Sequence, residues 1–220
     1  MAATFAALGV AHVAFADESN ADLGRKLTDA TAVYHELISS TDNVVPKQLL
    51  ENSKCIVVIP HVIKGAIVYG ANHGTGVMSC RNAAGHWSAP SFVALTGGSV
   101  GFQIGAETTD LVLFFMTEHG ARSLMTGSKV TLGGQASVAA GPLGRSGEAS
   151  TDLKLDAEIY SYSKSKGLFA GLSIGGARLA ADKKANATYY GKPVTVKQLI
   201  FDQSVTNIPA EAQEFCKALP

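Results

Sequence analysis

Two short segments of the chain match the pattern that presents the nucleophilic serine of many hydrolases. They read GGSVG at Gly97–Gly101 and GLSIG at Gly171–Gly175, with Ser99 and Ser173 as the central serines. In such enzymes the serine lies on a sharp turn between a strand and a helix, where a histidine takes the proton from its hydroxyl. The chemistry that these residues could perform is therefore acyl transfer to serine.

The sequence around the two serines does not support that chemistry. After Ser99 the apolar residues Val100, Phe102 and Ile104 alternate with glycine or glutamine, and strand-like sequence also follows Ser173, so neither serine leads into a helix. No histidine follows Ser173, and the single histidine after Ser99 is His119. We therefore expect no enzyme and interpret both serines as small residues on glycine-rich strands, with a serine hydrolase as the remote alternative.

Motifs for metals and cofactors are also incomplete. The segment HELIS at His35–Ser39 begins like the zinc motif H-E-x-x-H, but serine stands where the second histidine is needed. The chain has neither G-x-x-x-x-G-K-[ST] nor G-x-G-x-x-G. We expect no metal site and no cofactor. The cysteines, Cys55, Cys80 and Cys216, permit one disulfide and leave one thiol, and the pairing stays open.

Charge is balanced overall but not locally. Lys plus Arg and Asp plus Glu number 18 each, so no net field draws the chain to nucleic acid. Between Tyr160 and Lys197, seven basic residues face the single acid Asp182, a local charge of +6. Basic residues interleaved with aromatic rings are typical of surfaces that dock on anionic lipid, although exposed hairpin tips would give the same pattern. The predicted lipid-binding residues are Lys164, Lys166, Arg178, Lys183, Lys184, Tyr162 and Phe169.

The N-terminal residues have the character of an export signal. Residues 1–16 are apolar, and Ala14-Phe15-Ala16 has the A-x-A form of a signal-peptidase site. We predict a signal peptide or an apolar tail at 1–16, followed by a single domain at 17–220. We expect export to the periplasm or cell envelope, peripheral to the membrane, because no other apolar run approaches the ~20 residues of a spanning helix.

The periodicity of apolar residues predicts the elements that would position these groups. Ser19 and Asp22 form a capping-box-like start to an amphipathic helix that ends near Ser40, and Leu111–Phe115 is apolar throughout, as in a strand buried on both faces. The resulting fold class is α+β, with one strongly curved, mostly antiparallel, barrel-like sheet, the N-terminal helix and short C-terminal helices. The other predicted elements are a short helical turn at 46–50, strands at 55–59, 66–69, 87–95, 100–104 and 129–139, a helix at 117–125, a hairpin at 159–163 and 167–175 that 177–181 extends, and helices at 195–201 and 210–219.

Several longer segments together resemble a known family. They are CIVVIPHVIKGAIVYGANHGTGVMSCR, HWSAPSFVALTGGSVGFQIGAETTDLVLFF, ASVAAGPLGR, YSYSKSKGLFAGLSIGGA and NATYYG, in that order between about Leu23 and Phe201. The chain resembles the SYLF domain, in the stand-alone exported form known from bacteria. The resemblance implies binding of anionic phospholipid, of phosphoinositides in eukaryotic members, and of actin in some. It does not imply catalysis.

The sequence thus favours a non-enzymatic, lipid-binding module of the cell envelope. Its expected partner is anionic phospholipid or a membrane surface, and actin enters only if the chain is cytosolic. The alternative is a structural or carrier protein of the envelope that encloses an apolar ligand among its glycine-rich strands.

Overall fold

The computed structural model describes residues 18–40, 45–66, 70–99, 105–125, 129–142, 156–165, 168–171 and 174–220. The predicted signal peptide at 1–16 and the alternating segment at 100–104 lie outside the described residues, as do Lys166 and Ser173.

The first helix, α1 (Asn20–Ser39), confirms the predicted capping box. The side chain of Ser19 accepts a hydrogen bond from the Asp22 N–H, and the Asp22 carboxylate accepts one from the Ser19 N–H. These two bonds satisfy donors that the first helical turn leaves free. One apolar stripe of the helix is buried against the sheet, as the three- and four-residue spacing predicted. Its members are Leu23, Leu27, Ala30, Val33, Tyr34 and Leu37.

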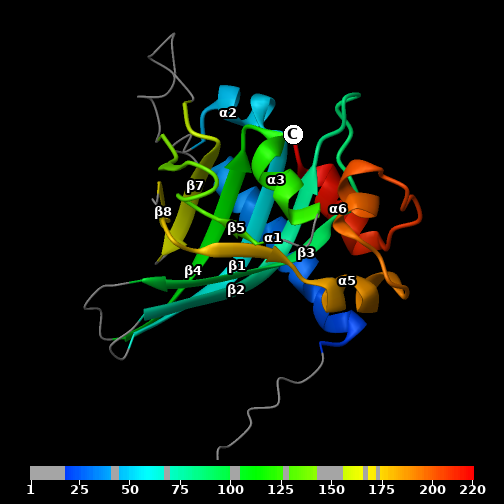
Figure 1. Cartoon of the computed structure of the whole chain (residues 1–220), viewed down its shortest axis with the longest axis horizontal. Coiled ribbons are helices and arrows are strands. Elements are labelled where there is room, and N and C mark those ends of the chain that lie inside the picture. The colour runs from blue at the N-terminus through cyan, green and yellow to red at the C-terminus, as the bar shows by residue number, and fades with distance from the viewer. Residues whose placement is uncertain are drawn as a thin grey trace, which may run out of the picture.

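A nine-stranded sheet forms the centre of the molecule (Figure 1). Its order is β5-β9-β3-β2-β1-β4-β7-β6, with β8 paired to β7, and among the strand pairs of the described residues only β6–β7 is parallel. The sheet curls into a half-barrel, with α1 behind it and α3 in front in Figure 1. The strands are β1 (Cys55–Ala66), β2 (Gly70–Cys80), β3 (Ser91–Ser99), β4 (Gly105–Phe115), β5 (Val130–Thr131), β6 (Val138–Ala140), β7 (Ile159–Ser165), β8 (Leu168–Gly171) and β9 (Arg178–Ala181).

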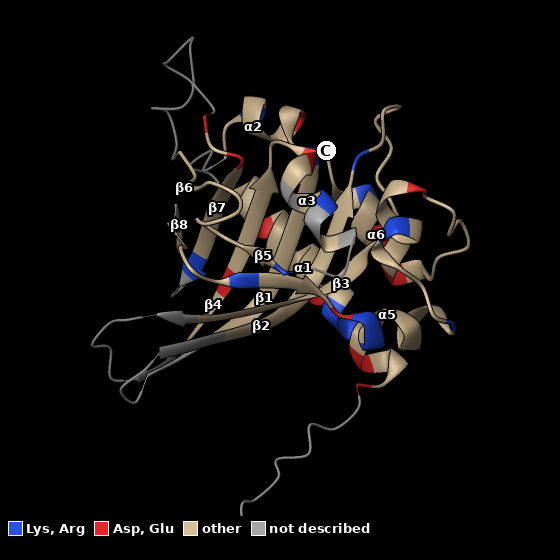
Figure 2. Ribbon diagram, viewed as in Figure 1, with Lys and Arg blue, Asp and Glu red and all other residues tan. Residues whose placement is uncertain are grey.

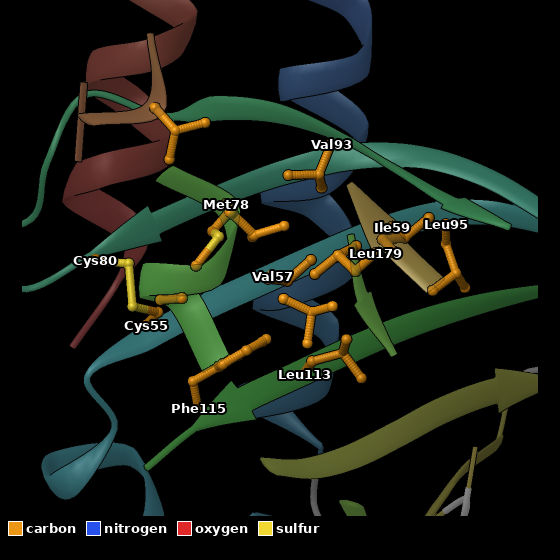
Figure 3. Close-up of a cluster of buried hydrophobic side chains, with 14 of the residues drawn as sticks. Cys55, Val57, Ile59, Met78, Cys80, Val93, Leu95, Leu113, Phe115 and Leu179 are labelled. Carbon is orange, nitrogen blue, oxygen red and sulfur yellow. A yellow bond between two sulfur atoms is a disulfide. The ribbon is translucent and has the colours of Figure 1, made fainter. Parts of the chain in front are cut away.

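Both faces of the central strands are buried, but in different cores. On β1, Cys55, Val57 and Ile59 face the inside of the curl, whereas Ile56 and Val58 face α1. The prediction for Leu111–Phe115 on β4 is confirmed, because all five residues are buried and alternate between the same two cores. Figure 3 shows the inner core, which also takes side chains from α3 and from β9.

A bulge bends the sheet in its central strand. Pro60 lacks the N–H that a ladder needs, and Pro60 and His61 together face a single residue, Asp110, on β4. His61 adopts a φ of 53°, and its N–H donates to Asp110 Oδ1 at 3.0 Å. On the other side, β2 approaches so closely that a Cβ on Gly76 would lie 2.1 Å from the Val58 carbonyl oxygen. This position therefore requires glycine.

The remaining elements confirm some of the predictions and correct others. The helices are α2 (Lys47–Asn52), α3 (Glu118–Met125), α5 (Lys183–Tyr190), the π-helix η1 (Lys197–Phe201) and α6 (Ala210–Ala218). The single strand predicted at 129–139 is wrong, because Gly133 takes a φ of 76° in a turn that separates β5 from β6. Arg178–Ala181 does not extend the β7–β8 hairpin; it pairs with β3 and β5 instead. Strand β2 and helix α5 were not predicted, and the strand predicted at 66–69 lies mostly outside the described residues.

Within the described ranges, no helix combines the length and the apolar character needed to cross a bilayer.

Candidate functional site

The predicted lipid-binding residues lie in two places rather than one. Lys164 and Phe169 belong to the β7–β8 hairpin, whereas Arg178 begins β9 and Lys183 and Lys184 begin α5. In Figure 2 the basic residues of β7 and those of β9 and α5 appear as separate blue segments. The charge excess along the sequence therefore does not form one continuous patch among the described residues.

Lys164 is already engaged within the fold. Its ammonium group forms an ion pair with the Glu36 carboxylate of α1 and lies 5.7 Å from the centre of the Phe169 ring. Only 22% of its side chain is exposed. This lysine joins α1 to the hairpin, so its charge is largely compensated.

Tyr162 is not a surface residue. The prediction placed its ring at a membrane interface, but the side chain is fully buried and meets Phe114 edge-on, with ring centroids 5.7 Å apart. Its hydroxyl donates to the Pro142 carbonyl at 2.7 Å, and burial raises the pKa of this phenol well above its usual range. A Cβ on Gly141 would lie 2.1 Å from the ring. Strand alternation directs Tyr162 into the core beneath α1.

The segment from β9 into α5 holds the more accessible charges. We call Arg178–Tyr190 the β9–α5 segment. Arg178 and Lys183 are exposed, and neither forms an ion pair with another described residue; Lys184 is exposed as well. The only acid of the segment, Asp182, accepts hydrogen bonds from the N–H groups of Lys184 and Ala185 as the N-cap of α5. The positive end of the helix dipole lies at the same place.

A buried asparagine fixes α5 to the sheet. Asn186 is 1% exposed, its Oδ1 accepts from the Phe92 N–H at 2.8 Å, and its Nδ2 donates to Ser91 Oγ at 3.1 Å. Asn186 also opens the sequence N-A-T, a glycosylation sequon. Because its amide nitrogen is occupied inside the fold, the folded chain does not offer it for glycosylation.

A groove lies between the first turns of α1 and the bulged part of β1. Its volume is about 320 Å³, and it is open to solvent. The side chains that line it are mainly charged or imidazole groups: Glu18, Asp22, Arg25, Lys26, Asp29, His61 and His73, with Pro60, Ile63, Gly74 and Thr75. Sequence reasoning missed this groove, because its histidines lie in separate strands and the bulge that turns His61 outward has only Pro60 as a signal.

The first hydrolase-like serine, Ser99, lies at the end of a described strand. Ser99 is the last residue of β3 and pairs with Gly70, and the next described element is the strand β4 rather than a helix. Ser173 lies outside the described residues. Within the described part of the chain, no three His, Cys, Asp or Glu side chains gather closely enough to hold a metal ion.

The cysteine pairing, which the sequence left open, is Cys55 with Cys80. These residues face each other across β1 and β2, with Cα atoms 4.0 Å apart and a disulfide between them. Cys216 is free, half-buried on α6, and donates to the Ser88 carbonyl at 3.2 Å. Burial raises the pKa of the Cys216 thiol to about 11.

The half-barrel sheet, its covering helices and the order of the motifs define an α+β domain of the SYLF class. A family model described as "Ysc84: Las17-binding protein actin regulator" matches residues 96–220. The chain belongs to this family.

Curated relatives extend the match over most of the chain. LAS seventeen-binding protein 3 of Saccharomyces cerevisiae is 36% identical over 173 residues, which are 78% of this chain and 38% of the relative. SH3 domain-containing YSC84-like protein 1 of Xenopus laevis is 35% identical over 179 residues, or 81% of this chain and 52% of the relative. The human protein of that name is 34% identical over 178 residues, with shares of 81% and 51%. The matched part of the chain therefore spans between about two fifths and a half of the length of these relatives.

Proposed function

We propose that this protein is a non-enzymatic module that docks on anionic phospholipid through the β9–α5 segment. The observation that carries the proposal is the exposure of Arg178 and Lys183 without an acidic partner among the described residues. They lie in a stretch, Tyr160–Lys197, whose formal charge is +6. Lys164 contributes less, because Glu36 compensates it.

The strength of such docking follows from the number of free cations. Each Lys or Arg near an anionic leaflet contributes about 1 kcal/mol, and the attraction falls off within a Debye length, about 8 Å at physiological salt. The two cations Arg178 and Lys183 of the β9–α5 segment would give reversible binding that salt weakens. The family match supports a role in binding and regulation; the position of Ser99 as the last residue of β3 favours a non-catalytic role.

The compartment is part of the proposal. We infer that the protein is exported to the periplasm or cell envelope, as residues 1–16 predict. The Cys55–Cys80 disulfide supports this inference, because disulfides persist in oxidising compartments and are rare in the cytosol.

A protein partner is the second candidate, favoured by the comparisons. The family description names Las17 binding and actin regulation, and one relative is itself named a LAS seventeen-binding protein. A cytosolic form of this chain would bind such a partner. A carrier role has less support, because the inside of the curl is filled by the side chains of the inner core, several of which Figure 3 shows.

Vesicle co-sedimentation tests the lipid proposal. We expect binding to vesicles that contain phosphatidylserine, and a loss of roughly thirtyfold in affinity for Arg178→Gln/Lys183→Gln, since two charges contribute about 2 kcal/mol. The control Lys47→Gln/Lys217→Gln removes two exposed lysines from α2 and α6 and should bind like the wild type. Equal binding by the two double variants would reject the β9–α5 segment as the docking site.

A further inference from the structure

A row of exposed side chains crosses the face of the sheet that α1 covers, next to the first turns of this helix. Strand register places Arg178 of β9 opposite Thr96 of β3, Thr96 opposite His73 of β2, and His73 opposite Ile63 of β1. Directly opposed residues share a face of the sheet. All four are exposed, and Ile63 is 53% exposed. We call these four residues the outer-face row.

The composition of this row complements an anionic bilayer. Arg178 supplies a fixed positive charge, Thr96 a hydroxyl donor, His73 an imidazole and Ile63 an apolar side chain. Because neighbouring strands lie about 4.8 Å apart, Arg178 and His73 are separated by about 10 Å at the backbone, which lies within the area of a few lipid headgroups. Helix α5 follows β9 on the same side of the sheet, because its Ala185 and Tyr189 pack in the core that also contains the buried stripe of α1.

The net charge of the groove beside this row changes sign when both of its histidines are protonated. The charged groups that line the groove opposite His61 and His73 are Glu18, just before α1, and Asp22, Arg25, Lys26 and Asp29 of α1. Three acids and two bases give the lining a net charge of −1 with neutral imidazoles and +1 with both protonated.

Most of these acids already have partners. Lys26 pairs with Glu18 at 2.7 Å and Arg25 pairs with Asp22. The hydroxyl and N–H of Ser19 also hydrogen-bond the Asp22 carboxylate, and these bonds lower the pKa of Asp22. The Asp110 carboxylate accepts a hydrogen bond from the backbone N–H of His61. Most carboxylates around His61 and His73 are therefore engaged, and histidine is the residue type whose charge ordinarily changes between about pH 5 and 8.

We propose that the outer-face row, with His61 beside it, is a membrane-facing surface whose attraction for anionic lipid increases on acidification. This inference rests on the proposed function and adds Thr96, His73, Ile63 and His61 to the basic residues of the β9–α5 segment. Above neutrality the groove weakly repels an anionic leaflet, and at acidic pH it joins Arg178 in attracting it.

The test is co-sedimentation with phosphatidylserine-containing vesicles at about pH 7.5 and about pH 5.5, which span the titration range of histidine. We expect the affinity of the wild-type protein to rise on acidification by up to roughly 25-fold, about fivefold for each added charge. His73→Gln should lose about fivefold of this rise, and His61→Asn/His73→Gln should lose nearly all of it. Asn suits position 61 because it tolerates a positive φ.

Two further variants separate this surface from a general effect of pH. His86→Gln changes an exposed histidine in the turn before β3 and should keep the full rise. Thr96→Glu places an acid between Arg178 and His73 at an exposed position and should weaken binding at both pH values. A wild-type protein that binds equally at both pH values, or a His73→Gln variant that keeps the whole rise, overturns the inference and leaves the proposed function standing. Failure of the wild type to prefer phosphatidylserine at either pH rejects both.

Discussion

Asn186 offers the sharpest test of how the β9–α5 segment is attached to the sheet. It is a buried polar residue on α5. Phe92 lies one residue before the part of β3 that pairs with β9, and the Asn186 amide takes the place of a strand partner there. It accepts from the Phe92 N–H at 2.8 Å and donates to Ser91 Oγ at 3.1 Å, with a longer contact to the Phe92 carbonyl at 3.4 Å. The Asn186 side chain thus helps to anchor the helix that carries Lys183 and Lys184 to β3.

The cost of removing this amide follows from those contacts. Asn186→Ala leaves the Phe92 N–H buried without an acceptor, which costs about 1–3 kcal/mol, and loses the bond to Ser91, about 1 kcal/mol. We expect a loss of about 2–4 kcal/mol in the free energy of unfolding, or a fall of roughly 5–15 °C in Tm for a chain of this size. Urea denaturation followed by circular dichroism measures the first quantity and calorimetry the second.

Two comparisons make the result interpretable. Asn186→Asp keeps an acceptor for Phe92 but cannot donate to Ser91 and buries a charge, so it should destabilise the fold at least as much as alanine. Asn52→Ala, at an exposed position of α2, should change stability by less than about 0.5 kcal/mol. If Asn186→Ala were as stable as Asn52→Ala, the amide would not anchor α5 and the reasoning would be refuted.

Three further predictions concern packing and the cysteines. Gly76→Ala should cost about 3 kcal/mol or more, because its Cβ would lie 2.1 Å from a backbone carbonyl oxygen of β1; Gly175→Ala, where a Cβ meets nothing within 4 Å, is the control, and similar melting temperatures would contradict the close approach. Cys55→Ser/Cys80→Ser should lose about 3.5 kcal/mol of stability, because the disulfide closes a loop with a sequence separation of 25; the difference should vanish in melts under reducing conditions. Labelling of Cys216 by a thiol reagent should be slow at neutral pH and accelerate toward its pKa of about 11, since the thiolate reacts; rapid labelling of the folded protein at neutral pH would show that the thiol is not buried.

Local patterns predicted the parts of the fold that local chemistry determines. The Ser19–Asp22 capping box, the stripe of α1 and the doubly buried run of β4 all follow from residues close together in the sequence. The resemblance to SYLF domains, carried by longer segments, is confirmed by the family match.

Elements with weaker periodicity were missed. Helix α5, KKANATYY, has no continuous apolar stripe, and it is held by Asn186 rather than by a run of leucines. Its signals were present at both ends, as the N-cap Asp182 and the C-cap Gly191, which takes a φ of 66°. Caps locate a helix more reliably here than hydrophobicity does.

The candidate site shows where sequence reasoning stops. Nothing near Lys164 in the sequence reveals that Glu36, far away in the chain, compensates it. The basic residues of the β9–α5 segment were predicted because they lie close together in the sequence. The outer-face row was not, because His73 and Arg178 share a surface only through strand pairing.

Flotation with vesicles of phosphatidylcholine alone and of phosphatidylcholine with phosphatidylserine, at low and high salt, tests the central claim most directly. The account predicts that the protein floats with the phosphatidylserine vesicles at low salt, remains behind at high salt, and never floats with the neutral vesicles. Equal flotation with both kinds of vesicle, or with neither, would contradict it.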